Sequence, residues 1–219
     1  KVLPGILFED LPNIDVVLVS HNHYDHLDVK TLKKLSNSYN PKIFSGLGNS
    51  KFMEKKKIKN SYDLDWWQSI NFNNSTRITF VPAQHFSNRF ISDHHKTLWG
   101  GFIIESGKNV IYFAGDTGFG IHFSQIKNKF PNITLAILPI GAYKPRWFME
   151  YDHLSPQDAI KTHLILKPKH SIAVHFGTFP LGDDAEHEAK NELKNYLIKN
   201  SITEEDFWIL DCGTKRYIH

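Results

Sequence analysis

The stretch that decides the fold is Val16-Val17-Leu18-Val19-Ser20-His21-Asn22-His23-Tyr24-Asp25-His26-Leu27-Asp28. Its first five residues form an apolar run that predicts a strand buried on both faces. Side chains alternate with a period of two in extended backbone, so His21 and His23 point to the same side, and Asp25 and His26 follow in the turn behind them. Imidazole and carboxylate groups suit a divalent first-row metal ion, zinc before others. Because this cluster is too crowded for one ion, the stretch predicts a binuclear metal centre.

Three further polar residues follow apolar runs later in the chain and are candidates for the remaining ligands. They are His85 in Val81-Pro82-Ala83-Gln84-His85, Asp116 after Ile111-Tyr112-Phe113-Ala114-Gly115, and His175 after Ser171-Ile172-Ala173-Val174. A carboxylate directly after a buried strand is costly to bury unless a positive charge lies beside it, and metal ions supply one. Each residue alone also fits a cap, a turn or a hydrogen-bonded core position. Beside the first cluster, the sequence favours metal ligation for all three.

Composition narrows the class of protein. The 219 residues carry 26 Lys and Arg against 23 Asp and Glu, a net charge of +3, with 41% hydrophobic and 22% charged residues. We therefore expect one globular domain over residues 1–219. No apolar run approaches the roughly 20 residues of a membrane-spanning helix. The single cysteine, Cys212, excludes a disulfide scaffold and fits a reducing compartment, so a cytoplasmic location is predicted. The mild, spread-out positive charge does not indicate a nucleic-acid partner.

Two groups of residues leave alternatives open. The densest basic cluster is either a solvated helix face or a patch for phosphate or an anionic membrane; it comprises Lys51, Lys55, Lys56, Lys57 and Lys59. Four large aromatic residues fit the core, or else an apolar groove or lipid contact; they are Trp66, Trp67, Trp147 and Phe148.

Strands and helices alternate along the rest of the chain, which predicts a layered α/β architecture. Apolar runs predict strands at 16–20, 42–45, 78–81, 98–105, 109–114, 135–140, 171–175 and 207–210. Asp28 is placed to cap a helix, and Ser155-Pro156-Gln157-Asp158 is typical of a helix start with a capping box. The ladder Ala185, Ala189, Leu193 and Leu197 predicts a long amphipathic helix.

The ligand pattern His21-x-His23-x-Asp25-His26 with His85, Asp116 and His175 resembles the metallo-β-lactamase superfamily of binuclear hydrolases. Further blocks are similar to the family of N-acylphosphatidylethanolamine-hydrolysing phospholipase D and its bacterial relatives, and together they cover nearly the whole chain. These blocks are Asp65-Trp66-Trp67, Leu98-Trp99-Gly100, Phe113–Gly118, Pro139–Tyr143, Pro145–Met149 and His175–Phe179. The resemblance implies a four-layer αββα sandwich. Family members begin with further strands before the segment that aligns with Lys1, so we expect this chain to lack the first N-terminal strands.

The resemblance also implies roles for individual residues. His21, His23 and His85 would hold one metal ion, Asp25, His26 and His175 the second, and Asp116 would bridge both. Zinc is expected, with iron and manganese as alternatives. Tyr24 and His153 correspond to positions near the bound phospholipid, although Tyr24 also fits a packed aromatic in a turn and His153 a helix-entry residue. Asp116, Asp25 and His153 are the predicted catalytic residues.

The function that the resemblance implies is a phosphodiesterase of phospholipase D type, acting on N-acylphosphatidylethanolamine-like lipids. Two alternatives remain: a metallo-hydrolase of another ester, lactone or phosphodiester, and a truncated metal-binding remnant without catalysis. A phospholipid or small phosphodiester is the expected substrate. Contact with the inner face of a membrane would be peripheral, and exposed sheet edges could support a homodimer.

Overall fold

The predicted first strand lies at the edge of a small parallel sheet in the computed structural model, which describes residues 4–90 and 92–218. This sheet has the order β1-β2-β3, and its strands are β1 (Val16–Val19), β2 (Lys42–Gly46) and β3 (Ser61–Leu64). Val17 pairs with Ile43, and Ile43 pairs with Ser61 in parallel register. The carboxyl end of β1 therefore points the same way as those of its neighbours.

A second, seven-stranded sheet has the order β10-β9-β8-β7-β6-β5-β4. Its strands are β4 (Ser69–Asn71), β5 (Thr76–Val81), β6 (Gly101–Ser106), β7 (Asn109–Phe113), β8 (Leu135–Pro139), β9 (His170–Val174) and β10 (Phe207–Trp208). β6 is antiparallel to both β5 and β7, whereas β7, β8 and β9 are mutually parallel. Consequently β5, β7, β8 and β9 all end at the same edge of the sheet.

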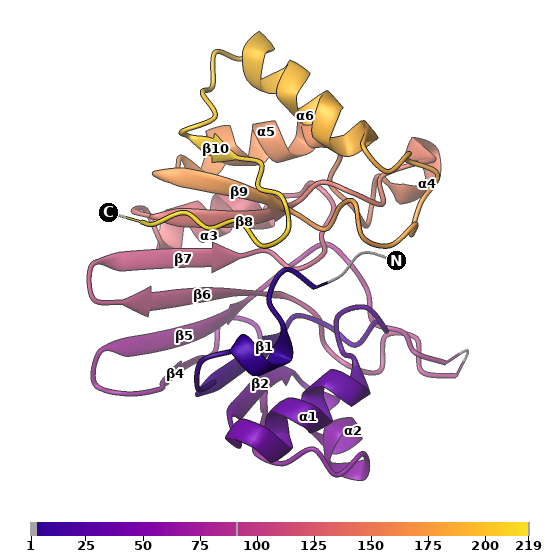
Figure 1. The fold of residues 1–219 in the computed structure, drawn as a ribbon, viewed down its shortest axis with the longest axis vertical. Coiled ribbons are helices and arrows are strands. Elements are labelled where there is room, and N and C mark those ends of the chain that lie inside the picture. The colour runs from indigo at the N-terminus through magenta and orange to yellow at the C-terminus, as the bar shows by residue number, and fades with distance from the viewer. Residues whose placement is uncertain (1–3, 91, 219) are drawn as a thin grey trace.

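Helices cover the outer faces of the two sheets (Figure 1). The helical segments are η1 (Phe8–Asp10), α1 (Val29–Tyr39), α2 (Asn49–Lys55), α3 (His122–Lys129), α4 (Arg146–Met149), α5 (Pro156–Leu166) and α6 (Glu188–Lys199). One buried cluster joins α1 and α2 to the small sheet through Leu32, Met53 and Ile43. A second cluster, which includes Phe44 and Phe80, joins the two sheets to each other.

The third and largest cluster fills the other side of the seven-stranded sheet, where Phe123, Ile160 and Leu193 bring α3, α5 and α6 onto β7 and β8. The predicted α/β class is therefore confirmed, with two sheets flanked by helices. The predicted strands and the predicted caps are also present. Asp28 accepts a hydrogen bond from the backbone of Thr31, and Ser155 and Asp158 form the capping box of α5.

Several predicted boundaries were wrong because hydrogen bonds to other segments end the element. Residues 98–100 do not extend β6, since Leu98 and Gly100 donate backbone hydrogen bonds to Leu47 and Ser20 at the end of the small sheet. Ala185 lies before α6, because its backbone is tied to Glu188 in the turn that precedes the helix. The last strand stops at Trp208 rather than Leu210.

The four large aromatic residues divide between the two interpretations. Trp67 packs against the largest buried cluster. Trp66 is at the surface with 36% of its area exposed. Trp147 and Phe148 lie on α4 and are 80% and 65% exposed, so a core position is wrong for this pair. Helix α4 has only four residues, and none of them is buried, so it offers no inward face that could bury both aromatic rings.

None of the helices formed by residues 4–90 and 92–218 combines the length and the apolar character that a bilayer span requires. The cytoplasmic location stays a prediction.

Replacing Ser155 with alanine should destabilise the protein by about 1 kcal/mol, the usual value of a helix N-cap. The Ser155 hydroxyl donates to the Asp158 carboxylate at 2.7 Å and accepts from the Asp158 backbone at 3.2 Å, so both bonds are lost together. Urea unfolding measures the change. Ser38→Ala on the exposed face of α1 is the matched control, and equal stability of the two variants would contradict the prediction.

Candidate metal centre

The predicted ligands converge because they all follow strands that end at one edge of the fold. His85 lies beyond the end of β5, Asp116 lies beyond β7, and His175 comes directly after β9. The segment 21–26 follows β1 of the small sheet and reaches the same edge, where the Ser20 carbonyl accepts a hydrogen bond from Gly100. Residues separated by up to 154 positions in sequence are thereby brought into one cluster.

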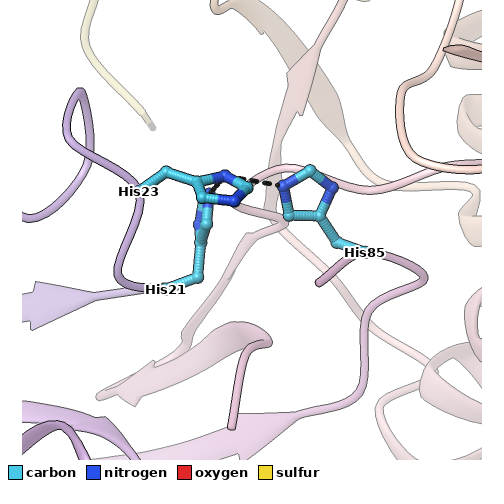
Figure 2. Close-up of side chains that lie close together, drawn as sticks. All are labelled: His21, His23 and His85. Atoms are coloured by element: carbon cyan, nitrogen blue, oxygen red, sulfur yellow. Dashed lines mark hydrogen bonds between the residues drawn. The ribbon is translucent and has the colours of Figure 1, made fainter. Parts of the chain in front are cut away.

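Three histidines form the first ligand group (Figure 2). Nε2 of His21 lies 2.9 Å from Nδ1 of His23, and Nε2 of His85 lies 3.2 Å from the same atom. Bonds of about 2.0–2.1 Å in a tetrahedral zinc site place neighbouring ligand atoms roughly 3.3 Å apart, so this spacing fits one divalent ion. Nδ1 of His85 donates to the backbone carbonyl of Asp152 at 2.9 Å, which directs the Nε2 lone pair of His85 into the group.

The second group joins two carboxylates and two histidines. Oδ2 of Asp116 lies 3.0 Å from Nε2 of His26 and 3.2 Å from Nε2 of His175. Oδ2 of Asp25 lies 3.2 Å and 3.4 Å from the same two nitrogens. The Asp116 oxygen is also 3.8 Å from Nε2 of His21 and 4.0 Å from Nε2 of His85. Asp116 therefore lies between the two groups, as a bridging ligand must.

Two unusual backbone conformations make this convergence possible. Gly115, directly before Asp116, has φ +63°, and a Cβ atom there would lie 2.6 Å from the Cβ of Ser20. Only glycine fits both that conformation and that approach of β7 to the end of β1. His175 itself has φ +60°, which turns the chain sharply as it leaves β9. A left-handed conformation at a residue other than glycine costs energy and is concentrated at functional sites.

Electrostatics differ between the two groups. Burial lowers the pKa of His23 to about 4 and that of His85 to about 3, and burial lowers the pKa of His21 well below its ordinary value. All three imidazoles are thus neutral near pH 7. Neutral imidazole is the form that binds a metal ion, so the first group is ready to accept one.

In the second group the carboxylates reverse the effect of burial. Burial alone would lower the pKa of His26, but the charge of Asp116 and hydrogen bonds to Asp116 and Asp25 raise it to about 10. The pKa of His175 is raised in the same way. Burial would raise the pKa of Asp116, yet the surrounding histidines hold it well below its ordinary value. The carboxylate is therefore charged while only 4% of its residue is exposed.

These observations fit two divalent metal ions. Each of the two sets, His21–His23–His85 and Asp25–His26–Asp116–His175, offers ligand atoms that all lie within 4.8 Å of one another. Oδ1 of Asp116 is buried and makes no hydrogen bond to the described residues, so the carboxylate keeps a free oxygen for a second ion. A nitrogen and carboxylate donor set suits zinc, iron or manganese.

The two residues predicted to lie near substrate differ in position. His153 is beside the ligands, with its ring centroid 5.1 Å from that of His85 and 5.8 Å from that of His175. Its Nδ1 atom is buried and unpartnered among the described residues. Tyr24 instead lies at the surface, 61% exposed, and its hydroxyl donates to the Arg89 carbonyl at 3.0 Å.

A cavity of about 480 Å³ adjoins the second ligand group, with Asp25, His26 and His175 in its wall. The rest of the wall is largely apolar and comes from the loop after β9, the loop before α4 and the start of α6. These residues include Ala142, Phe176, Phe179, Pro180, Leu181, Ala185 and Ala189. The sequence pattern did not reveal this cavity, since its walls belong to loops without apolar periodicity.

Sequence reasoning also missed Arg89 and Asn22. Arg89 donates through Nη1 to the carbonyls of Asn22 and Leu27, both at 2.8 Å. The Asn22 side chain accepts a hydrogen bond from the Asn88 backbone at 2.8 Å. Contacts to backbone atoms more than 60 positions away leave no pattern in the sequence that could have identified them.

The fold and the donor set define a protein of metallo-β-lactamase fold with a candidate binuclear metal centre. The chain belongs to the β-lactamase superfamily, since the family model for the Beta-lactamase superfamily domain matches residues 2–176. The resemblance predicted from the sequence is thereby confirmed at the level of the superfamily.

Known proteins support a narrower similarity. The chain is 37% identical to N-acyl-phosphatidylethanolamine-hydrolyzing phospholipase D 1 of Caenorhabditis elegans, covering 96% of this chain and 62% of that protein. It is 34% identical to the mitochondrial N-acyl-phosphatidylethanolamine-hydrolyzing phospholipase D of Saccharomyces cerevisiae, covering 84% of this chain and 41% of that protein. The chain thus spans less than two thirds of these relatives. A solved metallo hydrolase from Ignicoccus hospitalis shares the fold, with a TM-score of 0.71 at 20% identity over 95% of this chain and 82% of that one.

Metal uptake by the second ligand group should release protons, because His26, with a pKa of about 10, is protonated near pH 7 and must become neutral to bind. Affinity for the second zinc ion should therefore fall as the pH is lowered, while the first group binds zinc with no comparable proton release. Calorimetric titration of zinc in two buffers of different ionisation enthalpy counts the protons. Zinc binding at both groups without proton release would contradict the prediction.

Proposed function

We propose that this protein is a metal-dependent hydrolase that cleaves phosphodiester bonds of N-acylphosphatidylethanolamine-like lipids. The observation that carries the proposal is the pair of ligand groups on either side of Asp116, of which the second adjoins a largely apolar cavity. Similarity to two phospholipases D of this specificity, at 37% and 34% identity, supports the choice of substrate.

The ligand groups assign roles to this chain's own side chains. His21, His23 and His85 would hold one divalent ion, Asp25, His26 and His175 the other, and Asp116 both. When bound, two such ions supply Lewis-acid stabilisation of phosphoryl oxygens and lower the pKa of water towards neutrality. Asp116 and Asp25 would contribute the negative charge that offsets the charge of the ions.

We assign contact with the substrate to His153, whose ring lies beside those of His85 and His175. Burial lowers its pKa, so the ring is neutral near pH 7. A neutral ring with a free Nδ1 atom can donate one hydrogen bond to a non-bridging phosphoryl oxygen or to the leaving group.

The cavity favours a substrate with an apolar chain next to its scissile group. Phe176, Phe179 and Leu181 form apolar walls within reach of Asp25 and His175. Burying apolar surface contributes about 25 cal/mol per Å², so a fatty-acyl chain would gain affinity there and a nucleotide or short polar ester would not. The apolar wall therefore supports a lipid substrate over a short polar ester, lactone or phosphodiester.

A phospholipid substrate also calls for contact with the membrane surface. Trp147 and Phe148 project from α4, which precedes His153 by a few residues. Aromatic side chains of this kind partition into the interfacial region of a bilayer. We therefore place peripheral membrane contact at α4; a homodimer stays a prediction.

The direct test measures zinc per chain by elemental analysis together with release of N-acylethanolamine from vesicles, before and after chelation. We expect about two metal ions per chain and activity that chelation removes and zinc restores. Asp116→Asn should lower turnover at least about a hundredfold by weakening both ligand groups. The matched control is Asp211→Asn at an exposed position. Two bound metal ions with turnover of lactones or nucleotides alone would reject the lipid substrate, and a folded chain without metal would reject the hydrolase.

A second prediction separates membrane contact from chemistry. The double variant Trp147→Ser, Phe148→Ser should hydrolyse lipid in vesicles at least about tenfold more slowly, because burial of even one large apolar side chain contributes about 1.5–3 kcal/mol. Its turnover of a soluble chromogenic phosphodiester should be unchanged. Ile198→Ser on α6, 79% exposed in the native chain, is the control. Equal losses on both substrates would show that α4 shapes the active site and does not bind lipid.

A further inference from the structure

Arg89 connects the two ends of the turn that carries three of the seven proposed metal ligands. A single nitrogen, Nη1, donates to the carbonyl of Asn22 and to the carbonyl of Leu27, each at 2.8 Å. Asn22 precedes His23, and Leu27 follows His26. The arginine therefore closes a loop that contains three ligands, one for the first group and two for the second.

Each end of this turn has a second anchor, so the arginine acts between fixed points. The Asn22 side chain accepts from the Asn88 backbone at 2.8 Å, and the Leu27 side chain is fully buried against α1 and α2. Within the turn, the backbone N–H groups of His26 and Leu27 both donate to the His23 carbonyl, at 3.2 Å and 2.8 Å. The arginine therefore adds a side-chain link between the two ends of a turn that its own backbone hydrogen bonds also close.

The arginine is itself held in place by its surroundings. Its guanidinium carbon lies 4.1 Å from the ring centroid of Tyr24 and 4.9 Å from that of Phe52. Arginine stacks on aromatic faces at such distances. Its backbone N–H donates to the Asp93 carboxylate at 2.9 Å, and its carbonyl accepts from the Tyr24 hydroxyl. Tyr24 therefore contacts both ends of the arginine residue, which gives this exposed tyrosine a role away from the substrate.

We propose that Arg89 is a positioning residue of the metal centre, which fixes the distance between His23 and the Asp25–His26 pair so that the two ligand groups can be filled together. This inference rests on the proposed metal centre but not on the identity of the substrate. Outer partners that orient ligands typically change metal affinity by about 10–100-fold when they are removed. Two of the three ligands inside the loop belong to the second group, so the second zinc ion should lose more affinity than the first.

The test is zinc binding to Arg89→Met, which keeps the apolar stem between Tyr24 and Phe52 and removes both hydrogen bonds. Zinc affinities are measured by competition with a chromophoric chelator, and the visible absorption of the cobalt-loaded protein reports the coordination at each group. We expect the second zinc ion to bind about 10–100-fold more weakly and the cobalt spectrum to change. Arg89→Lys should recover part of the affinity, since one ammonium group can reach a carbonyl. Arg77→Met, at the far end of β5, should match the native protein.

Each outcome has a defined meaning. Native zinc affinity and an unchanged cobalt spectrum in folded Arg89→Met would overturn the proposal. Should that variant fail to fold, Arg89→Lys carries the test, and native affinity for two zinc ions in it overturns the proposal equally. A native chain that binds no zinc would overturn both this inference and the proposed function. Normal zinc binding without lipid hydrolysis would reject the proposed substrate and leave the role of Arg89 intact.

Discussion

The buried carboxylate of Asp116 is the group on which the rest of the structure depends. A negative charge with 4% exposure in a protein interior is stable only where positive charge lies beside it. Here His26 and His175, the two histidines with raised pKa values, lie 3.0 Å and 3.2 Å from one of its oxygens. The same charge that raises the pKa of His26 to about 10 is the charge that would hold two metal ions together. Because either protons or metal ions can supply the compensating charge, the fold can form before the centre is loaded. The competition between protons and metal ions then decides how the centre is filled.

The topology follows from the need to deliver ligands to that carboxylate. β5, β7 and β9 run in the same direction, so His85, Asp116 and His175 emerge at one edge. The small sheet has to bring its own ligands to this edge, and it can do so only because Gly115 lets β7 approach the end of β1. The apolar cluster between the sheets, around Phe44 and Phe80, fixes that approach. The packing of the two sheets against each other therefore also determines the geometry of the candidate metal centre.

The sequence predicted the candidate ligands that the fold brings together, but it did not predict the residues that support them. Four candidate ligands could be predicted because an apolar strand is followed directly by a dense polar turn: His21, His23, Asp25 and His26. The other three, His85, Asp116 and His175, could be predicted because each follows an apolar strand. No sequence pattern marks Arg89, because it donates hydrogen bonds to the backbone carbonyls of Asn22 and Leu27. Every residue has a backbone carbonyl, so the identity of these two residues does not reveal the contact. The exposure of Trp147 and the cavity beside Phe179 also escaped prediction. Both depend on how short loops fold against one another, and loops have no periodicity that a sequence pattern can report.

The candidate ligands at the strand ends and the loops around the cavity would have different roles in function. In the proposed function the ligand groups would determine only the type of reaction, because two divalent ions and a bridging carboxylate serve many hydrolyses equally well. Substrate choice must then come from residues that touch no metal ion. Under the proposed function these would be the apolar loop from Phe176 to Leu181, Ala142 before α4, and the exposed ring of Trp147. Those loops can vary without disturbing the strand ends that hold the ligands, whereas a change at Gly115 or Arg89 would reach the metal centre directly. Similarity in the loops is therefore a stronger argument for a shared substrate than similarity in the ligands.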